Sequence, residues 1–125
     1  NDVAVIANGV TAFGRALARG DAAPIACFVR EDGEVVAGAT GRTEFGRLFV
    51  AYLWVAGSLR RQGIGGKALA ELEAAAVRRN CRDALIETLN DETAAIYRRR
   101  GYRDIAVIQN YVGRFAKYVL LKSLP

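Results

Sequence analysis

A glycine-rich stretch beside two arginines is the part of this sequence best suited to holding an anionic group. It reads RRQGIGGK, from Arg60 to Lys67, and it follows the apolar run LFVAYLWV. Glycine permits positive φ angles and a close backbone approach, and the first amides of a helix have no partner within that helix. Such a turn binds phosphate through its N–H groups and through the partial positive charge of the helix end. We therefore expect a phosphate-bearing ligand at this loop.

Two familiar phosphate loops fit this stretch poorly. A nucleoside-triphosphate loop requires a first glycine where Arg61 stands, and Ser or Thr where Ala68 stands. A dinucleotide fingerprint is formally matched by Gly63, Gly65 and Ala68, and Glu87 lies roughly where a ribose-binding acid would. That fingerprint begins directly at the end of a strand, whereas here GSLRRQ intervenes. A dinucleotide-binding module remains as an alternative.

Composition limits the other chemistries that this chain can perform. It contains no histidine and two cysteines, Cys27 and Cys81. The absence of histidine removes the usual base of serine and cysteine hydrolases. A zinc or iron centre needs about four Cys or His ligands, so we predict no such metal site, although carboxylate-bound Mg²⁺ is not excluded. We interpret both cysteines as reduced structural thiols, with redox or nucleophilic roles as the alternative.

The charge balance favours anionic ligands. The chain has 18 Lys and Arg against 13 Asp and Glu, a net charge of +5. Basic residues cluster at the glycine loop, at Arg78 and Arg79, and at Arg98 to Arg100. No aromatic residues alternate with these clusters as in a single-strand binder, so nucleic acid is disfavoured as a partner. We interpret the last two clusters as solvated helix ends, where cations complement the helix dipole.

The elements that must position the loop form one mixed α/β domain over residues 1–125. Spacings of three and four predict helices, and apolar or alternating runs predict strands. The predicted helices cover 3–17, 64–79 and 91–100, and the predicted strands cover 25–30, 35–40, 47–56, 84–89, 102–109 and 115–122. This order gives antiparallel hairpins, one strand–helix–strand crossover and a closing antiparallel pair. No apolar run reaches the roughly 20 residues that span a bilayer, so we expect a soluble cytoplasmic protein with no membrane partner.

Two motifs together resemble the GNAT superfamily of acyl-CoA-dependent N-acyltransferases. RRQGIGG after LWV resembles its coenzyme loop, and IYRRRGY, residues 96–102, resembles its later signature of a helix tyrosine, a glycine and an aromatic residue. VVAGATGRTEFGRLFVAYLWV and YVGRFAKYVLLK are similar to a bacterial subfamily of undefined substrate. The resemblance covers nearly the whole chain but omits the family's usual first strand. Because the chain starts at Asn1 and contains no Met, we expect N-terminal residues to be missing.

The resemblance implies a GNAT fold and a site for acetyl-CoA. In this fold a mixed, mostly antiparallel sheet is flanked by helices and its central strands splay apart. The pantetheine arm would enter the splay beside the strand before the loop, where a backbone amide can also stabilise an oxyanion. Asn90 would bind the same arm, although it is equally suited to cap a helix. The implied coenzyme contacts are Leu53, Trp54, Val55, Arg60, Arg61, Gln62, Gly63, Ile64, Gly65, Gly66, Lys67 and Asn90.

The resemblance also implies a general acid, and it leaves the base open. Tyr97 would protonate the departing thiolate, since a phenol of ordinary pKa near 10 is protonated at neutral pH; the alternative is a core aromatic residue. Glu44 and Glu87 are candidate bases. The related subfamily has an acidic residue where this chain has Ala51, so deprotonation through ordered water or Tyr52 is another route.

These features predict an N-acetyltransferase that moves an acetyl group directly from acetyl-CoA to a primary amine in a ternary complex. The expected acceptor is a small amine or a protein amine. The features are compatible with a homodimer. The alternative is a non-catalytic module that binds acyl-CoA or a dinucleotide.

Overall fold

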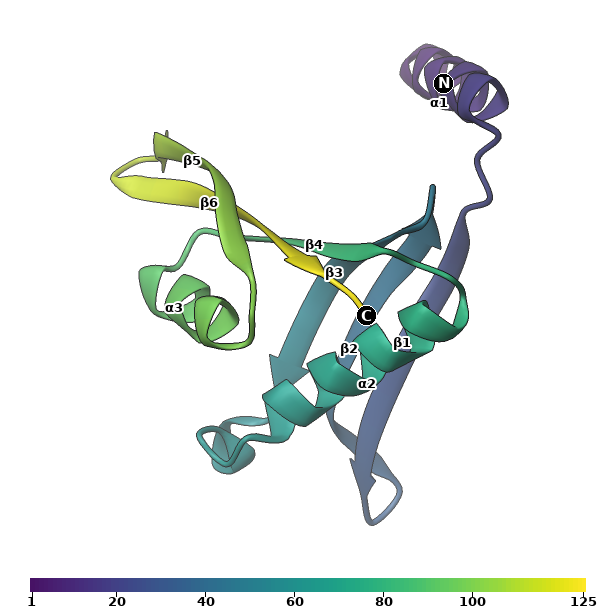
Figure 1. The fold of residues 1–125 in the computed structure, drawn as a ribbon. Coiled ribbons are helices and arrows are strands. Elements are labelled where there is room, and N and C mark those ends of the chain that lie inside the picture. Colours follow the sequence, from purple (N-terminus) through teal and green to yellow (C-terminus); the bar gives the residue numbers. More distant parts are fainter.

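The computed structural model describes all 125 residues and has one six-stranded sheet with two helices packed on one face (Figure 1). The helices are α1 (Asp2–Ala18), the short 3₁₀ helix η1 (Gly57–Leu59), α2 (Ile64–Arg78) and α3 (Asp91–Arg99). The strands are β1 (Ala23–Glu31), β2 (Glu34–Glu44), β3 (Arg47–Val55), β4 (Asp83–Thr88), β5 (Arg103–Val112) and β6 (Phe115–Ser123). The predicted α/β class and order of elements are confirmed.

The sheet has the order β1-β2-β3-β4-β6-β5, and every neighbouring pair is antiparallel except β3 and β4. Those two strands are joined by α2 and pair in parallel only from Arg47 with Asp83 to Phe49 with Leu85. An ion pair with two hydrogen bonds links the paired ends of β3 and β4, because Arg47 Nε and Nη2 lie 2.7 and 3.0 Å from the Asp83 carboxylate oxygens. Beyond Phe49, β3 continues to Val55 without pairing to β4. The predicted splay between the central strands is therefore present.

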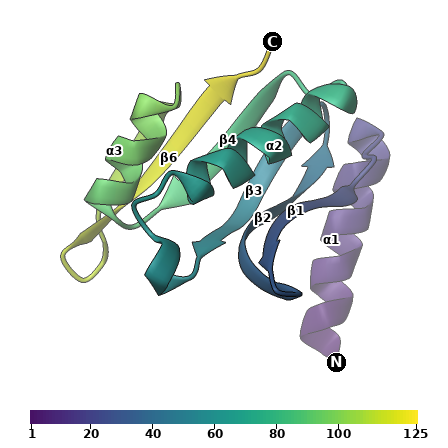
Figure 2. The same ribbon diagram turned by 90° about the horizontal axis from the view of Figure 1, so that it is seen from below.

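The core lies between the sheet and α2. Ala68, Leu69, Leu72 and Ala76 recur at helical spacing and are buried, as the amphipathic pattern predicts. Leu48 of β3 is fully buried beneath the same helix face. Burying a leucine side chain stabilises the fold by about 1.5–3 kcal/mol, so this stripe fixes the position of α2 on the sheet. Figure 2 shows α2 and α3 in front of the sheet and α1 behind it.

Helix α1 forms where the sequence predicts it, but its apolar face packs against nothing. Asn1 caps it by accepting a hydrogen bond from the Ala4 amide at 2.8 Å. Its large apolar side chains are 68–76% exposed: Val3, Val5, Ile6, Val10, Phe13 and Leu17. Periodicity identifies a helix with an apolar stripe without identifying a partner for that stripe. The connection of α1 to the sheet is instead polar, through Arg15 and Glu44.

Candidate active site

A cavity of about 500 Å³ lies between the C-terminal half of β3, the start of α2 and helix α3. Several predicted coenzyme contacts line it: Leu53, Trp54, Val55, Arg60, Arg61, Gly63, Ile64, Gly65 and Gly66. The predicted acid, Tyr97, lines it as well. Gln62, Lys67 and Asn90 do not, whereas sequence reasoning missed Leu59, Leu69, Thr93, Ile96 and Arg100, which do. The cavity thus combines the splayed strand, the glycine loop and one face of α3.

The loop presents backbone amides that have no backbone partner. Gly63 adopts a φ of 77° and Arg61 a φ of 66°, which turns the chain from η1 into α2. The first hydrogen bond of the helix runs from the Lys67 amide to the Gly63 carbonyl at 3.1 Å. The amides of residues 64–66 precede that bond and have no carbonyl one turn earlier to bind. These donors, at the positive end of the helix dipole, suit a phosphate group.

The glycines at the start of α2 also permit close packing between elements. A Cβ atom at Gly65 would lie 3.0 Å from Val55 Cγ2, so the missing side chain lets α2 approach β3. A Cβ atom at Gly66 would lie only 1.5 Å from where Arg100 Nη2 sits. The guanidinium of Arg100 therefore passes over Gly66 and fills the space of a side chain. The pair links the start of α2 to the end of α3.

The positive charges at the cavity differ in how they are held. Arg60 Nε donates to the Val55 carbonyl oxygen at 3.1 Å, which ties its guanidinium to the end of β3. Arg61 and Arg100 make no hydrogen bond or ion pair through their side chains. Their charge is therefore available to an anion, at a site where the loop amides already favour one.

Tyr97 lines the cavity and has a neutral hydroxyl. Its side chain is 6% exposed and packs against Tyr102, with ring centroids 5.9 Å apart. The hydroxyl makes no hydrogen bond to the protein, yet no buried side-chain oxygen lacks a partner, so this oxygen keeps some solvent exposure. Burial raises the pKa of the Tyr97 phenol above its ordinary value. The group is protonated at neutral pH and can donate a proton.

Asn90 acts as the N-cap of α3. Its side-chain oxygen accepts a hydrogen bond from the backbone amide of Thr93 at 2.9 Å. Its backbone amide donates to Thr88 Oγ1 at 3.2 Å. Of the two roles that the sequence leaves open, the capping role is the one seen in the fold. The cap sets where α3 begins and hence where Tyr97 faces.

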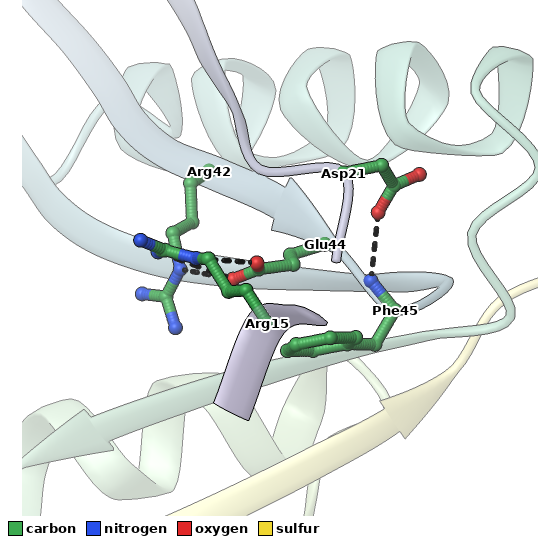
Figure 3. A network of polar contacts seen from close by, with 5 residues as sticks. All are labelled: Arg15, Asp21, Arg42, Glu44 and Phe45. Carbon is green, nitrogen blue, oxygen red and sulfur yellow. Dashed lines mark hydrogen bonds and ion pairs between the residues drawn. The ribbon is translucent and has the colours of Figure 1, made fainter. Parts of the chain in front are cut away.

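Glu44, one of the two candidate bases, lies away from the cavity. Its carboxylate is 2% exposed and is bound by Arg15 Nε at 2.6 Å and by Arg42 Nε at 3.5 Å (Figure 3). Hydrogen bonding from Arg15 lowers the pKa of Glu44. Glu44 pairs opposite Arg47 at the start of β3, and the eight residue steps from there to Val55 span roughly 26 Å. Position and ion pairing both make Glu44 unsuited to deprotonate an amine in the cavity.

The other carboxylate and the tyrosine considered for the base also lie outside the cavity lining. Glu87 on β4 is exposed and pairs with Lys117 Nζ of β6 at 2.9 Å. Tyr52 on β3 is 76% exposed and is not among the residues that line the cavity. None of the three residues considered as the base therefore lines the cavity.

Residues 9–102 match the model of the Acetyltransferase (GNAT) family. The chain belongs to the GNAT acetyltransferase family. The match includes the glycine loop, Tyr97 and the glycine–aromatic pair after α3, which are the motifs that line or position the cavity.

Two acetyltransferases show sequence similarity over much of the chain. Acetyltransferase Atu2258 of Agrobacterium fabrum is 39% identical over 75 residues, which cover 60% of this chain and 55% of that protein. The chain thus spans just over half the length of that relative. Blasticidin-S acetyltransferase of Streptomyces morookaense is 33% identical over 95 residues, which cover 75% of this chain and 70% of that protein.

A solved acetyltransferase structure from Bacillus cereus ATCC 14579 has the same fold. Its TM-score is 0.87 at 25% identity, with 96% of this chain and 89% of that chain covered. The family match and this likeness in fold together show the GNAT fold. No helix of this GNAT domain is long and apolar enough to cross a membrane. No three Cys, Asp or Glu side chains converge as metal ligands.

Proposed function

We propose that this GNAT domain transfers an acetyl group from acetyl-CoA to a primary amine within a ternary complex. The observation that carries the proposal is one cavity containing both an anion cradle and a proton donor. The cavity is lined by residues of the glycine loop, with the free amides of residues 64–66 and the unpaired charge of Arg61, and also by Tyr97 of α3. An acyl-CoA needs both, because it brings a pyrophosphate at one end and a thiolate leaving group at the other.

The splayed strand supplies the connection between these two parts. From Val50 to Val55, β3 is paired to β2 on one edge and unpaired on the edge that faces β4. The Val55 carbonyl already accepts from Arg60 Nε, and the other free N–H and C=O groups of this edge match the amides of a pantetheine arm, as a neighbouring strand would. One of these N–H groups would stabilise the oxyanion that forms when the amine attacks the thioester.

In the reaction that we propose, the amine nitrogen bonds to the acetyl carbon and the carbon–sulfur bond breaks. The sulfur leaves as a thiolate and takes the proton of the Tyr97 hydroxyl, which then regains a proton from water. Since neither candidate carboxylate lines the cavity, we propose that water takes one proton from the acceptor ammonium to give the neutral amine that attacks. Water takes a second proton from the same nitrogen as the amide forms. Holding both reactants in one cavity supplies the orientation that direct transfer requires.

Sequence similarity says little about which amine accepts the acetyl group. One relative is a blasticidin-S acetyltransferase, so a small amine-bearing antibiotic is one acceptor class to test. Small amines, amino acids and protein N-termini form the rest of the panel. A cytoplasmic location would give the enzyme access to acetyl-CoA.

Calorimetric titration with acetyl-CoA, followed by thiol-release measurements over the amine panel, tests the proposal. We expect binding by the wild-type domain and amine-dependent release of coenzyme A. Binding without release with any acceptor would support a non-catalytic acyl-CoA module instead. Absence of binding in a folded sample would overturn the assignment of the cavity, and tight binding of NAD in place of acetyl-CoA would favour the dinucleotide alternative.

A further inference from the structure

Helix α1 carries a row of large apolar side chains, called here the seam, that no other part of the domain covers. Spacings of three and four residues separate the members of the seam, which are Val3, Ile6, Val10, Phe13 and Leu17. This is the spacing of the a and d positions of a coiled coil, whose side chains lie on one side of a helix and pack against a second helix. All five are 68–76% exposed, and no strand or other helix packs along α1.

The side-chain bond between α1 and the sheet lies on the opposite side of the helix from the seam. Arg15 binds the carboxylate of Glu44 on β2. It stands two residues after Phe13 and two before Leu17, and two residues turn an α-helix by about 200°. Figure 1 shows α1 standing apart from the sheet. The helix is therefore held to its own sheet by its polar side, and the seam faces away.

A helix of this composition needs a packing partner along the seam. Isolated helices of up to about 15 residues are marginal in water even when they are rich in alanine, and most helices in proteins are stabilised by packing of an apolar face. Helix α1 has 17 residues and contains Gly9, Gly14 and several β-branched residues, which are weaker helix formers than alanine. An exposed ion pair contributes little to stability, so the bond of Arg15 does not replace that packing.

The two glycines within α1 indicate what covers the seam. Gly9 and Gly14 have no positive φ, and a Cβ atom at either would meet nothing within 4 Å. Nothing in the domain itself therefore requires glycine there. Both lie directly beside the seam, where the other flanking positions are Ala7 and Ala16. Small residues on both flanks let a second helix approach closely and leave room for a large side chain such as Phe13 of that helix.

We propose that α1 pairs antiparallel with α1 of a second copy of this chain, so that the domain forms a homodimer. A second copy brings the same seam and the same small flanking residues, as a two-fold symmetric contact requires. Helix α1 has an acidic residue in its first turn, Asp2, and a basic residue at its C-cap, Arg19. An antiparallel pair brings these opposite charges and opposed helix dipoles together, whereas a parallel pair would bring like charges together.

The area of the seam suits a specific dimer of modest affinity. Ten large side chains, five from each copy, would bury on the order of 1,000 Å². This is close to the roughly 1,200 Å² at which stable interfaces begin. We therefore expect a dissociation constant in the micromolar range. The homodimer goes beyond the proposed function and does not depend on it, because no residue of α1 lines the coenzyme cavity.

A lipid surface is a poorer occupant of the seam than a second copy. Amphipathic helices that lie on membranes have a strongly charged polar face rich in Lys and Arg. Helix α1 contains a single basic residue, Arg15, and that residue is bound to Glu44. The charge that would draw the helix to anionic lipid is therefore missing.

Sedimentation equilibrium of the domain over a micromolar concentration series tests the dimer. We expect the wild type to reach twice the 13.5 kDa mass of the chain. Val10→Asp places a charge in the middle of the seam, so it should raise the dimer dissociation constant by about 100-fold or more. Val5→Asp is the matched control, because Val5 lies off the seam and both valines are 69% exposed. This control should remain dimeric.

Gly14→Leu separates close helix pairing from general stickiness of an apolar helix. The domain has room for the added side chain, and leucine is the better helix former. In a close antiparallel pair the leucine would push the helices apart, so we expect the dimer to weaken about tenfold. Stronger association of this variant would contradict close pairing.

Each other result overturns the homodimer in a distinguishable way. A wild type that stays monomeric throughout the series would mean that no second copy covers the seam. Equal dissociation in Val10→Asp and Val5→Asp would reduce the effect to charge on the helix, and a dimer that survives both would place the interface on another surface. A monomer that binds vesicles of phosphatidylglycerol and phosphatidylcholine, and loses that binding in Val10→Asp, would assign the seam to a lipid surface.

Discussion

Replacing Tyr97 by phenylalanine separates chemistry from packing more cleanly than any other substitution in the cavity. The ring packs against Tyr102, and Phe keeps that contact. The hydroxyl makes no hydrogen bond to the protein, so its removal leaves no partner unsatisfied. We therefore expect the free energy of unfolding to change by no more than about 0.5 kcal/mol. Affinity for acetyl-CoA should be nearly unchanged as well.

The expected loss is in kcat. Burial raises the pKa of Tyr97, so the wild-type phenol is protonated throughout the neutral range and serves as acid in every turnover. General acid catalysis contributes roughly 10²- to 10⁴-fold. A thiolate is a comparatively stable leaving group, which places the effect at the lower end, about 100-fold or 2.7 kcal/mol. The wild-type rate should decline only as the pH rises above about 10, the ordinary pKa of tyrosine.

The assay is thiol release at saturating acetyl-CoA and acceptor, with a burst-free time course to show that chemistry limits the rate. Tyr102→Phe is the matched control, because it removes a neighbouring hydroxyl that binds Glu73 and does not line the cavity. That control should lose about 1–2 kcal/mol of stability and keep its kcat. A wild-type kcat in Tyr97→Phe across neutral pH would refute the acid role and leave Tyr97 as part of the core.

Three further predictions concern the loop and the hairpin. Gly65→Glu places a negative charge beside the free amides, so acetyl-CoA affinity measured by calorimetry should fall roughly 100-fold; unchanged affinity would remove the loop from the site. Gly66→Ala should displace the Arg100 guanidinium, lowering coenzyme affinity about tenfold while thermal stability holds or rises by up to about 1 kcal/mol from helix propensity. Arg15 and Arg42 lower the folded-state pKa of Glu44. The contribution of this carboxylate to the stability of the fold is therefore present above about pH 4.3, the ordinary pKa of Glu, and is lost as the pH falls further. Urea unfolding over a pH series should show the free energy of unfolding of the wild type approaching that of Glu44→Gln in acid. A difference between the two free energies that stays constant with pH would contradict this.

Much of the fold could be predicted because short periodic segments carry their own signals. The end of α3 at Arg99 follows from Gly101, which adopts the positive φ that favours glycine there. The end of β2 could not be predicted: the strand extends to Glu44 through a register shift between Thr40 and Gly41. A bulge interrupts the alternation on which sequence reasoning relies. The insertion of β6 between β4 and β5 depends on long-range pairing, which no local pattern specifies.

The parts of the candidate site that a single segment of the chain forms could be predicted. The parts that form where distant segments pack together could not. The glycine loop can be recognised by its residue types and by its place between a strand and a helix. Arg100 belongs to a basic cluster that sequence reasoning interpreted as a helix end, and only the packing of α3 beside Gly66 brings it into the site. Glu44 shows the opposite error, because proximity to β3 in the sequence does not reveal that it lies at the far end of that strand.

A crystal structure of the domain with coenzyme A bound tests the central claim most directly. The account predicts pyrophosphate oxygens about 2.7–3.2 Å from the amides of residues 64–66, the pantetheine arm beside Leu53 to Val55, and the sulfur next to the Tyr97 hydroxyl. Coenzyme bound outside the cavity, or bound in it with the sulfur directed away from Tyr97, would contradict the account.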